Sequence, residues 1–391
     1  MKIDKKYDYI ICGGGASGLL LSYSILSDEY FKNKKVLLVE KDKKKINDKT
    51  FCFWDDKKTI LDKIVEKEWS NAEFIDESYN SSFSLLPYKY KMIKSENLYT
   101  FLKNKIDKAS NFEYLNAEIS NISSCQNLNF IETSKGVFES QIIFSSIYNP
   151  KEYSFRKFPI IKQHFLGWVI ETDDIEFDDN KFRFMDFSIK QQNEIRFMYV
   201  LPYSKTKALF EYTFFGGEVL KDKDYEKEIK IYLKDQGIYN YKILEKEKGI
   251  IPMTCYPFFK RNTDNFISIG TAGGWTKAST GYTIKNSLEK IEVILDALKK
   301  DKPLSQIKFR NRFWYYDILF LDVLINSKGK GSKVFSDLFK NNDPILLFKF
   351  LGEKTSLIEE LRIFISVNVI LFVKSLFARV KSVYLKEFLK N

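Results

Sequence analysis

The chain opens with a short apolar run, closely spaced glycines and a helical pattern. Residues 9–12 form the run, which is typical of a buried parallel strand, and residues 19–26 have the composition of a helix. Gly13, Gly15 and Gly18 lie between them with the spacing G-x-G-x-x-G. This order predicts a strand, a tight turn and a helix at the start of a βαβ unit.

A second apolar strand, residues 36–39, ends at Glu40, about 20 residues beyond the last glycine, as a dinucleotide-binding unit requires. In such units the glycines permit the turn, the approach of a pyrophosphate and close helix packing, and the acid accepts hydrogen bonds from a ribose. The helix N-terminus offers N–H groups and a positive dipole end to the phosphates. The alternative is a glycine-rich turn in an unrelated α/β protein. The residues predicted to bind the dinucleotide here are Gly13, Gly15, Ala16, Gly18 and Glu40.

The hydrophobic pattern divides the chain into four parts. Residues 1–160 mix short strands and helices, and residues 161–249 form longer, aromatic-rich alternating strands typical of an antiparallel sheet. Residues 250–303 return to strand, turn and helix, and residues 304–391 are helical and apolar. We therefore expect an α/β protein: a Rossmann-type FAD-binding domain in two parts, an inserted antiparallel-sheet substrate domain and a helical C-terminal region.

The assignment to FAD comes from the second glycine-rich turn, which follows a predicted strand over residues 266–269. This turn lacks the G-x-G-x-x-G spacing, so it is a poor site for a second dinucleotide. It is typical of the late loop that closes over the ribityl chain and pyrophosphate in single-Rossmann flavoproteins. The residues predicted to contribute are Gly270, Thr271, Ala272, Gly273 and Gly281.

Composition narrows the chemistry further. The 391 residues include 35 Phe and 23 Tyr, which suits an aromatic-walled tunnel for an extended apolar ligand, although a Phe-rich core explains most of them as well. Four cysteines lack C-x-x-C spacing, and His164 is the only histidine, so we expect no metal site, and a reducing cytoplasm fits. Acid catalysis must then fall mostly on carboxyl groups.

The formal charge of +11 permits attraction to nucleic acid or to an anionic membrane, but a lysine-rich composition explains it equally well, and we expect no nucleic-acid partner. The N-terminus does not resemble a signal peptide, and the apolar stretch 363–373 is too short to span a bilayer. The end of the chain has apolar residues at helical spacing beside basic ones, which favours peripheral contact with the inner membrane face; the alternative is an amphipathic helix packed on its own domain. These residues are Phe377, Val380, Tyr384 and Phe388, with Lys374, Arg379, Lys381 and Lys386.

Glu211 is the main candidate for catalysis. It lies in the middle of a strand of aromatic residues, 209–215, where desolvation would raise its pKa and keep it protonated near neutral pH. The alternative is a glutamate on the solvent face of a half-buried strand. His164, Phe165, Trp168 and Trp275 are predicted to line the substrate cavity; for His164 and Trp275 the alternative is a place in the packed core.

Several of these segments together resemble the lycopene cyclase family, specifically its bacterial FAD-dependent lycopene β-cyclases. The similarity covers nearly the whole chain and rests on the glycine motif and on residues 47–54, 163–168, 185–187, 199–203, 209–213, 251–253, 269–282, 312–317 and 320–324. The resemblance gives Glu211 the place of the acid in a Phe-Leu-Glu-Glu-Thr-like motif. Tyr212 stands where some members have a second acid, so a scheme with paired carboxylates is in doubt. The resemblance also makes Thr271 the counterpart of an acidic flavin-loop residue of related hydroxylases.

The resemblance implies a redox-neutral reaction. A terminal double bond of lycopene is protonated, the ring closes through a carbocation, and loss of a proton gives a β-ionone ring. Reduced FAD is required without being consumed, and NADPH is the usual electron donor. Rival hypotheses are a flavin-dependent monooxygenase or desaturase acting on an apolar isoprenoid, and a non-catalytic lipid-surface protein. The number of rings formed, the ring isomer, direct binding of NADPH and the oligomeric state stay open.

Overall fold

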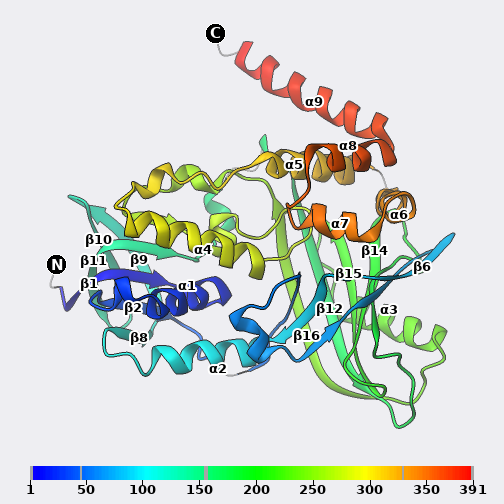
Figure 1. Cartoon of the computed structure of the whole chain (residues 1–391), viewed down its shortest axis with the longest axis horizontal. Helices are drawn as coiled ribbons and strands as arrows, with labels where there is room; N and C mark the ends of the chain where they lie inside the picture. The colour runs from blue at the N-terminus through cyan, green and yellow to red at the C-terminus, as the bar shows by residue number, and fades with distance from the viewer. Residues whose placement is uncertain (1–2, 45, 154–156, 328–329, 389–391) are drawn as a thin grey trace.

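The computed structural model describes residues 3–44, 46–153, 157–327 and 330–388, without the side chains of residue 152 and residues 382–388. The described chain contains three sheets and a C-terminal group of helices (Figure 1). In Figure 1 the N-terminal sheet lies at the left, the second large sheet at the right and the C-terminal helices along the top.

The N-terminal sheet has seven strands and a parallel centre. In order they are β8 (Phe112–Asn116), β2 (Val36–Glu40), β1 (Lys5–Cys12), β11 (Gly136–Ser145), β10 (Leu128–Thr133) and β9 (Ile119–Cys125), with β17 (Phe266–Ser268) paired to β11. The strands β8, β2, β1, β11 and β17 run parallel, whereas β10 and β9 are antiparallel. The last four residues of β1 are all buried, as expected for a central parallel strand covered on both faces.

Three helices cover one face of this sheet. They are α1 (Ala16–Ser27), α2 (Ser95–Ile106) and α4 (Ile284–Lys299). Helix α1 contacts both others, so segments from the start and from the late part of the chain form one layer. The helix α4 follows β17, which confirms that strand, turn and helix occur a second time in the sequence.

The second large sheet carries the inserted strands. In order they are β16 (Lys242–Thr254), β12 (Ile160–Glu171), β15 (Lys207–Gly216), β14 (Ile195–Pro202), β13 (Lys181–Asp186), β5 (Asn71–Asp76) and β6 (Tyr79–Ser84). All neighbours are antiparallel except β13 and β5. The sheet therefore extends beyond the predicted segment 161–249, because β5 and β6 join it from the first part of the chain. Pairing between strands about 100 residues apart leaves no local signal in the sequence.

Helix α3 (Asp222–Asp235) packs on one face of the second sheet. A small third sheet contains β3 (Thr50–Asp55), β7 (Lys89–Lys94) and β4 (Lys67–Trp69). The C-terminal helices are α5 (Arg312–Asn326), α6 (Gly331–Asn341), α7 (Pro344–Leu351), α8 (Leu357–Ser366) and α9 (Val369–Phe388). Short 3-10 helices span Glu29–Phe31, Ile60–Ile64, Pro150–Glu152, Phe258–Arg261, Gly270–Gly273 and Leu304–Gln306.

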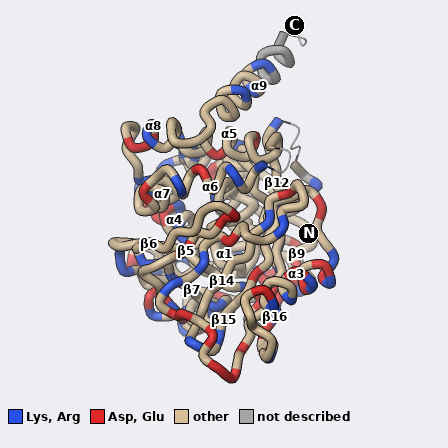
Figure 2. The backbone as a smooth tube through the Cα atoms, turned by 90° about the vertical axis from the view of Figure 1, so that its right-hand side faces the viewer, with Lys and Arg blue, Asp and Glu red and all other residues tan. Residues whose placement is uncertain are grey.

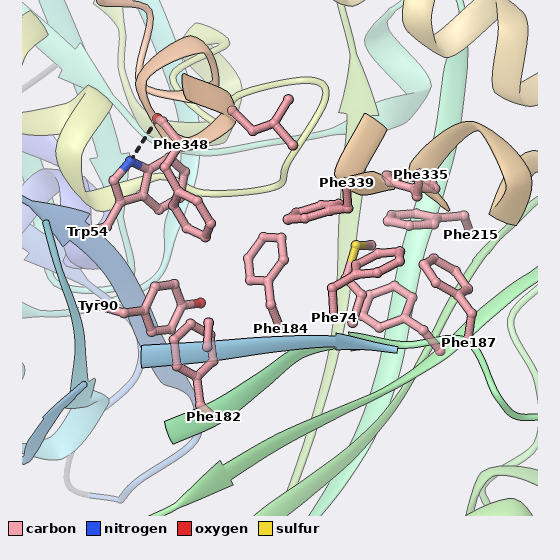
Figure 3. Packing of buried hydrophobic residues seen from close by; sticks show 14 of the residues in the cluster. Trp54, Phe74, Tyr90, Phe182, Phe184, Phe187, Phe215, Phe335, Phe339 and Phe348 are labelled. Atoms are coloured by element: carbon pink, nitrogen blue, oxygen red, sulfur yellow. Dashed lines mark hydrogen bonds between the residues drawn. The ribbon is translucent and has the colours of Figure 1, made fainter. Parts of the chain in front are cut away.

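The C-terminal helices close the side of the second sheet that faces away from α3. Figure 3 shows the aromatic layer between them, in which Phe335 and Phe339 of α6 lie over Phe74 and Phe215 of the sheet and over Phe187, which follows β13. The rings of Phe74 and Phe339 stack with centroids 4.4 Å apart. Much of the unusual Phe content is therefore used in a layered core.

Helix α9 projects away from the body of the molecule (Figures 1 and 2). In the part of the chain that the structure describes, no single helix has both the length and the apolar composition of a membrane span. Helix α8 and residues 369–381 of α9 meet these criteria together, with a bend of 106° between them.

Candidate active site

A cavity of about 1210 Å³ runs through the middle of the molecule. It begins at the N-terminal glycine motif, passes the face of the second sheet opposite α3 and reaches the bend between α8 and α9. Sites for a single drug-sized ligand have roughly 300–1,000 Å³, so this cavity is large enough for more than one group. Its polar end and its aromatic end are distinct.

The polar end contains the glycine cradle. Gly15 and Ala16 line the cavity, and a Cβ atom added at Gly15 would meet nothing within 4 Å. At Gly18, a Cβ atom would lie 2.0 Å from the carbonyl oxygen of Gly13, which itself has a φ of 100°. Gly18 is thus required for close packing and Gly13 for the turn, whereas Gly15 leaves room for a ligand.

The N-terminus of α1 also fits a phosphate group. Its N-cap residue is Gly15, so no side chain satisfies the first N–H groups of the helix, and the dipole end points to the cavity. Helix α4 begins at the same cavity after Thr283, also without a side-chain cap. The hydroxyl groups of Ser17 and Ser287 are 2.8 Å apart and join the two helices. These residues are suited to hold the pyrophosphate of FAD.

Glu40 has another visible role. Its carboxylate accepts hydrogen bonds from the N–H groups of Gly14 (2.6 Å) and Asp42 (2.8 Å), and the side chain is buried. Glu40 does not line the cavity. The carboxylate therefore holds the glycine loop in place, and its contact with a ribose stays a prediction.

The late glycine-rich turn lies at the same end of the cavity. Gly270, Thr271 and Gly281 line it, so the structure brings them together with Gly15, as a single dinucleotide site requires. Ala272 and Gly273 are buried and do not line the cavity. A Cβ atom at Gly273 would lie 2.2 Å from the Ser268 carbonyl oxygen, so this glycine serves the packing of the turn.

Glu211 lies in the middle of β15 and lines the cavity. Its neighbours Phe210 and Tyr212 point to the opposite face, where they pack with residues of α3. The solvent-exposed alternative is therefore excluded, since both faces of β15 are covered and Glu211 is only 8% exposed. Burial raises the pKa of Glu211 well above its ordinary value, and a hydrogen bond of 2.7 Å from the Thr213 hydroxyl opposes this effect only in part.

A second carboxyl group, Glu247 of β16, meets Glu211 across the intervening strand. Gly167 of β12 pairs with both residues, and its missing side chain leaves the space in which they approach. The two carboxyl groups are hydrogen bonded to each other, and Glu247 also accepts a hydrogen bond of 2.6 Å from the Thr50 hydroxyl. Burial raises the pKa of Glu247 to about 7. We call Glu211 and Glu247 the carboxyl pair.

The sequence analysis missed Glu247, because residues 245–248 alternate Glu and Lys and resemble a solvated strand. A signal was nevertheless present. Side chains two residues apart share a face of a strand, so Glu247 belongs with Ile251 and Met253 on an apolar face. The doubt that Tyr212 raised about paired carboxylates is therefore answered from another strand, since Glu247 supplies a second carboxyl group beside Glu211.

Three tyrosines lie close to the carboxyl pair. The hydroxyl of Tyr90 is 2.5 Å from those of both Tyr199 and Tyr282, and Tyr199 pairs directly with Glu211 in the register of β14 and β15. Burial raises the pKa of all three, so they are neutral phenols at physiological pH. Tyr199 and Tyr282 line the cavity, whereas Tyr90 lies behind them in the buried aromatic cluster of Figure 3.

Phe165 lines the cavity as predicted, but the predictions for His164, Trp168 and Trp275 are wrong. His164 and Trp168 alternate with Phe165 along β12 and therefore face α3, where the His164 ring lies 2.5 Å from the Tyr225 hydroxyl. Burial lowers the pKa of His164 to about 4, so the ring is neutral. Trp275 is fully buried beneath the late loop, among residues of the first domain.

The aromatic end of the cavity is built by the second sheet and the C-terminal helices. Sheet residues Phe184, Phe197 and Phe215 face Phe335 and Phe339 of α6 across it. The wall then continues along α8 and α9 to the bend between them. Its last lining residues are Ile363, Phe364, Val367, Val369, Phe372, Val373 and Leu376.

The chain is similar in sequence to known proteins over most of its length. The family model described as "Lycopene cyclase protein" matches residues 8–379. The chloroplastic lycopene beta cyclase of Arabidopsis thaliana is 24% identical over 317 residues, which cover 74% of this chain and 60% of that protein. A capsanthin/capsorubin synthase of Citrus sinensis is 22% identical over 393 residues, covering 90% and 75%. The chain thus spans less than two thirds of the Arabidopsis relative.

Solved structures share the fold at low sequence identity. A geranylgeranyl bacteriochlorophyll reductase-like protein from Thermoplasma acidophilum has a TM-score of 0.62 and 13% identity, covering 96% of this chain and 99% of that one. The p-nitrophenol 4-monooxygenase of Pseudomonas putida has a TM-score of 0.58 and 10% identity, covering 95% and 99%. The fold is therefore the α/β fold of FAD-dependent oxidoreductases, with an antiparallel sheet and C-terminal helices, which confirms the predicted fold class.

Proposed function

The chain belongs to the lycopene cyclase family, and from this premise we propose that it is a lycopene β-cyclase that requires reduced FAD. One observation carries the proposal: a buried acid, Glu211, lines a cavity that joins a dinucleotide cradle to an aromatic tunnel. An elongated hydrocarbon suits the aromatic end, and the cofactor suits the polar end.

The residues of the cavity have distinct tasks in the proposed reaction. Glu211 donates its proton to a terminal double bond of the polyene, which breaks an O–H bond and forms a C–H bond. The aromatic walls exclude water and present π-faces that favour the carbocation. When bound, reduced FAD supplies an electron-rich surface for the same positive charge. After ring closure, loss of a proton from an adjacent carbon forms the ring double bond, so there is no net oxidation.

We assign the pyrophosphate of FAD to Gly15, Ala16 and the N-terminus of α1, with Gly270, Thr271 and Gly281 on the facing wall. In this proposal NADPH serves as the electron donor that keeps FAD reduced. A flavin-dependent monooxygenase or desaturase on this fold would instead consume oxygen or an electron acceptor for every product molecule.

Expression in a lycopene-accumulating host, followed by chromatography of the pigments, tests the reaction. We expect β-carotene, or its one-ring precursor, from the wild type and none from Glu211→Gln with FAD still bound. Anaerobic incubation of the purified protein with lycopene and chemically reduced FAD separates the alternatives. Ring formation without oxygen supports cyclisation, and a strict need for oxygen or net oxidation of FAD would refute it.

We also propose that the protein docks on the inner face of the membrane through α8 and α9, where lycopene is dissolved. Six exposed apolar residues define this α8–α9 surface: Leu357, Ile358, Leu361, Ile365, Ile370 and Phe377. Ile365 is 74% exposed and Phe377 is 69% exposed, and the cavity reaches the bend between their helices. Exposed apolar clusters of this kind mark interaction sites.

Basic residues accompany the α8–α9 surface. Lys374 and Lys381 are exposed on α9, and no acidic residue occurs between positions 369 and 381 (Figure 2). Arg379 instead forms a salt bridge of 2.6 Å with Asp322, which ties α9 to α5 at this point. The predicted contributions of Tyr384, Lys386 and Phe388 lie outside the described side chains.

Flotation with vesicles that contain phosphatidylglycerol tests the docking. We expect the wild type to float with the vesicles and the double variant Ile365→Asp, Phe377→Asp to stay in the soluble fraction. Ile231→Asp is the matched control, because Ile231 is 44% exposed on α3, at the opposite side of the second sheet. Equal flotation of the double variant and the control would contradict the proposal.

A further inference from the structure

The carboxyl pair contains a second buried acid, Glu247, beside the proposed general acid Glu211. Gly167 lies between Glu211 and Glu247 in register, and a Cβ atom at this position would lie 3.4 Å from Glu211 Cβ and 3.3 Å from Glu247 Cγ. It would also lie 2.9 Å from Leu209 Cδ1. A glycine here is what permits two side chains from non-adjacent strands to meet above the sheet.

The hydrogen bonds of the carboxyl pair indicate which of the two groups carries the proton. Two carboxyl groups can bond to each other only when one of them is protonated. Glu247 accepts hydrogen bonds from the hydroxyl and the backbone N–H of Thr50, which favour its charged form. Glu211 accepts from the single hydroxyl of Thr213. The proton therefore belongs on Glu211, with Glu247 as the partner that accepts its hydrogen bond.

We propose that Glu247 is a positioning residue that shares one proton with Glu211 and keeps it on Glu211 until the substrate takes it. This inference rests on the proposed cyclase function. When Glu211 protonates the double bond, two carboxylates are left side by side in a buried site. Their repulsion favours recapture of a proton from the carbon next to the cation. The pair then regains its single proton, so the cycle needs no proton from bulk water.

Other titratable groups face the pair from the surrounding elements. Five are neutral at pH 7, since burial raises the pKa of each. They are Cys52 of β3, Tyr90 of β7, Tyr199 of β14, Tyr203 of the following turn and Tyr282 before α4. The sixth is Glu245 of β16, which is charged and pairs with Lys94 at 2.9 Å. Glu245 therefore serves as a charged control on the same strand.

The test compares the pH dependence of ring formation in three variants. Lycopene is supplied in phosphatidylcholine vesicles with chemically reduced FAD. Activity of the wild type should fall as the pH rises and Glu211 loses its proton. The Glu247→Gln variant lacks the negative charge that helps to raise the pKa of Glu211. The alkaline limb of its pH–rate profile, where activity falls, should therefore move to lower pH by about one unit or more. That shift corresponds to a loss of about tenfold at a pH on the falling limb.

In the conservative variant Glu247→Asp, activity should fall at nearly the same pH as in the wild type, because aspartate keeps the charge. Glu245→Gln should leave the limb unchanged, since Glu245 is bound to Lys94 and lies outside the cavity lining. If activity of Glu247→Gln fell at the same pH as that of the wild type, the inference would be overturned. A uniform loss of rate in all three variants, without any shift, would overturn it as well.

Infrared spectroscopy gives a second readout that needs no substrate. Protein labelled with ¹³C-glutamate should show a protonated-carboxyl band near neutral pH, and the midpoint of its titration should fall in Glu247→Gln. If the wild type shows this behaviour but forms no ring, the cyclase function fails and the shared proton stands. If the wild type cyclises lycopene but the band titrates identically in Glu247→Gln, the shared proton fails and the cyclase function stands.

Discussion

Lys277→Met is the most informative test of how the late loop is fixed to the C-terminal helices. The Nζ atom of Lys277 lies 3.1 Å from an oxygen of Asp317 on α5 and 2.9 Å from an oxygen of Glu353, which follows α7. The exposed fractions of the three side chains are 5%, 11% and 28%. Methionine keeps most of the length of the side chain and removes its charge.

The expected cost follows from this burial. Breaking a buried ion pair by removing one partner costs about 3–5 kcal/mol, because the other charge is left without compensation. Glu353 is partly exposed, so most of the cost comes from Asp317, whose pKa burial already raises despite the attraction of Lys277. Without Lys277, the Asp317 carboxyl would take up a proton, which limits the loss. We therefore expect a loss of about 3 kcal/mol at pH 8 and a smaller one at pH 5.

Denaturant unfolding at these two pH values measures the change. Lys34→Met is the matched control, because Lys34 pairs with Asp8 at 3.2 Å but is 37% exposed, and such pairs contribute roughly 0–1 kcal/mol. A loss for Lys277→Met no greater than that of the control would refute the reasoning, as would a loss independent of pH. Adding Asp317→Asn to Lys277→Met should restore part of the stability, since it removes the uncompensated charge.

Three further predictions concern the cradle, the buried histidine and the carboxyl pair. Gly15→Ala should unfold like the wild type but bind FAD more weakly, measured by flavin absorbance after gel filtration, whereas Gly18→Ala should also lose stability because its Cβ would collide with Gly13. His164→Phe should cost about 1–3 kcal/mol in denaturant unfolding, because the Tyr225 hydroxyl loses its buried partner, and should leave the carotenoid products unchanged. Both pKa values of the carboxyl pair are raised, so the folded state holds more protons than the unfolded state between about pH 4.5 and 7, and the contribution of the pair to stability should fall over this range as pH rises. Urea midpoints in Glu247→Gln should show a weaker fall with pH than in the wild type, and an identical slope would contradict the assignment.

The sequence by itself determined the features that depend on local pattern. The cradle is identified by the strand, the glycine spacing and the helix over residues 9–26. Each glycine is required there by a steric constraint from residues close to it in the sequence. The aromatic strand around Glu211 likewise made this acid the main candidate for catalysis, but it left open whether the side chain was buried or faced solvent. Motifs spread along the chain also indicated the family, and the family model confirms this by matching residues 8–379.

Only the tertiary structure decided which face each side chain uses and which distant strands are neighbours. The alternation along β12 sends Phe165 into the cavity and His164 to α3, and the composition of that segment does not distinguish the two faces. Glu247 lies 36 positions from Glu211 in sequence and meets it because both strands flank β12 at Gly167. Strand order is set by the burial of the whole sheet between α3 and the C-terminal helices, and no local pattern records it.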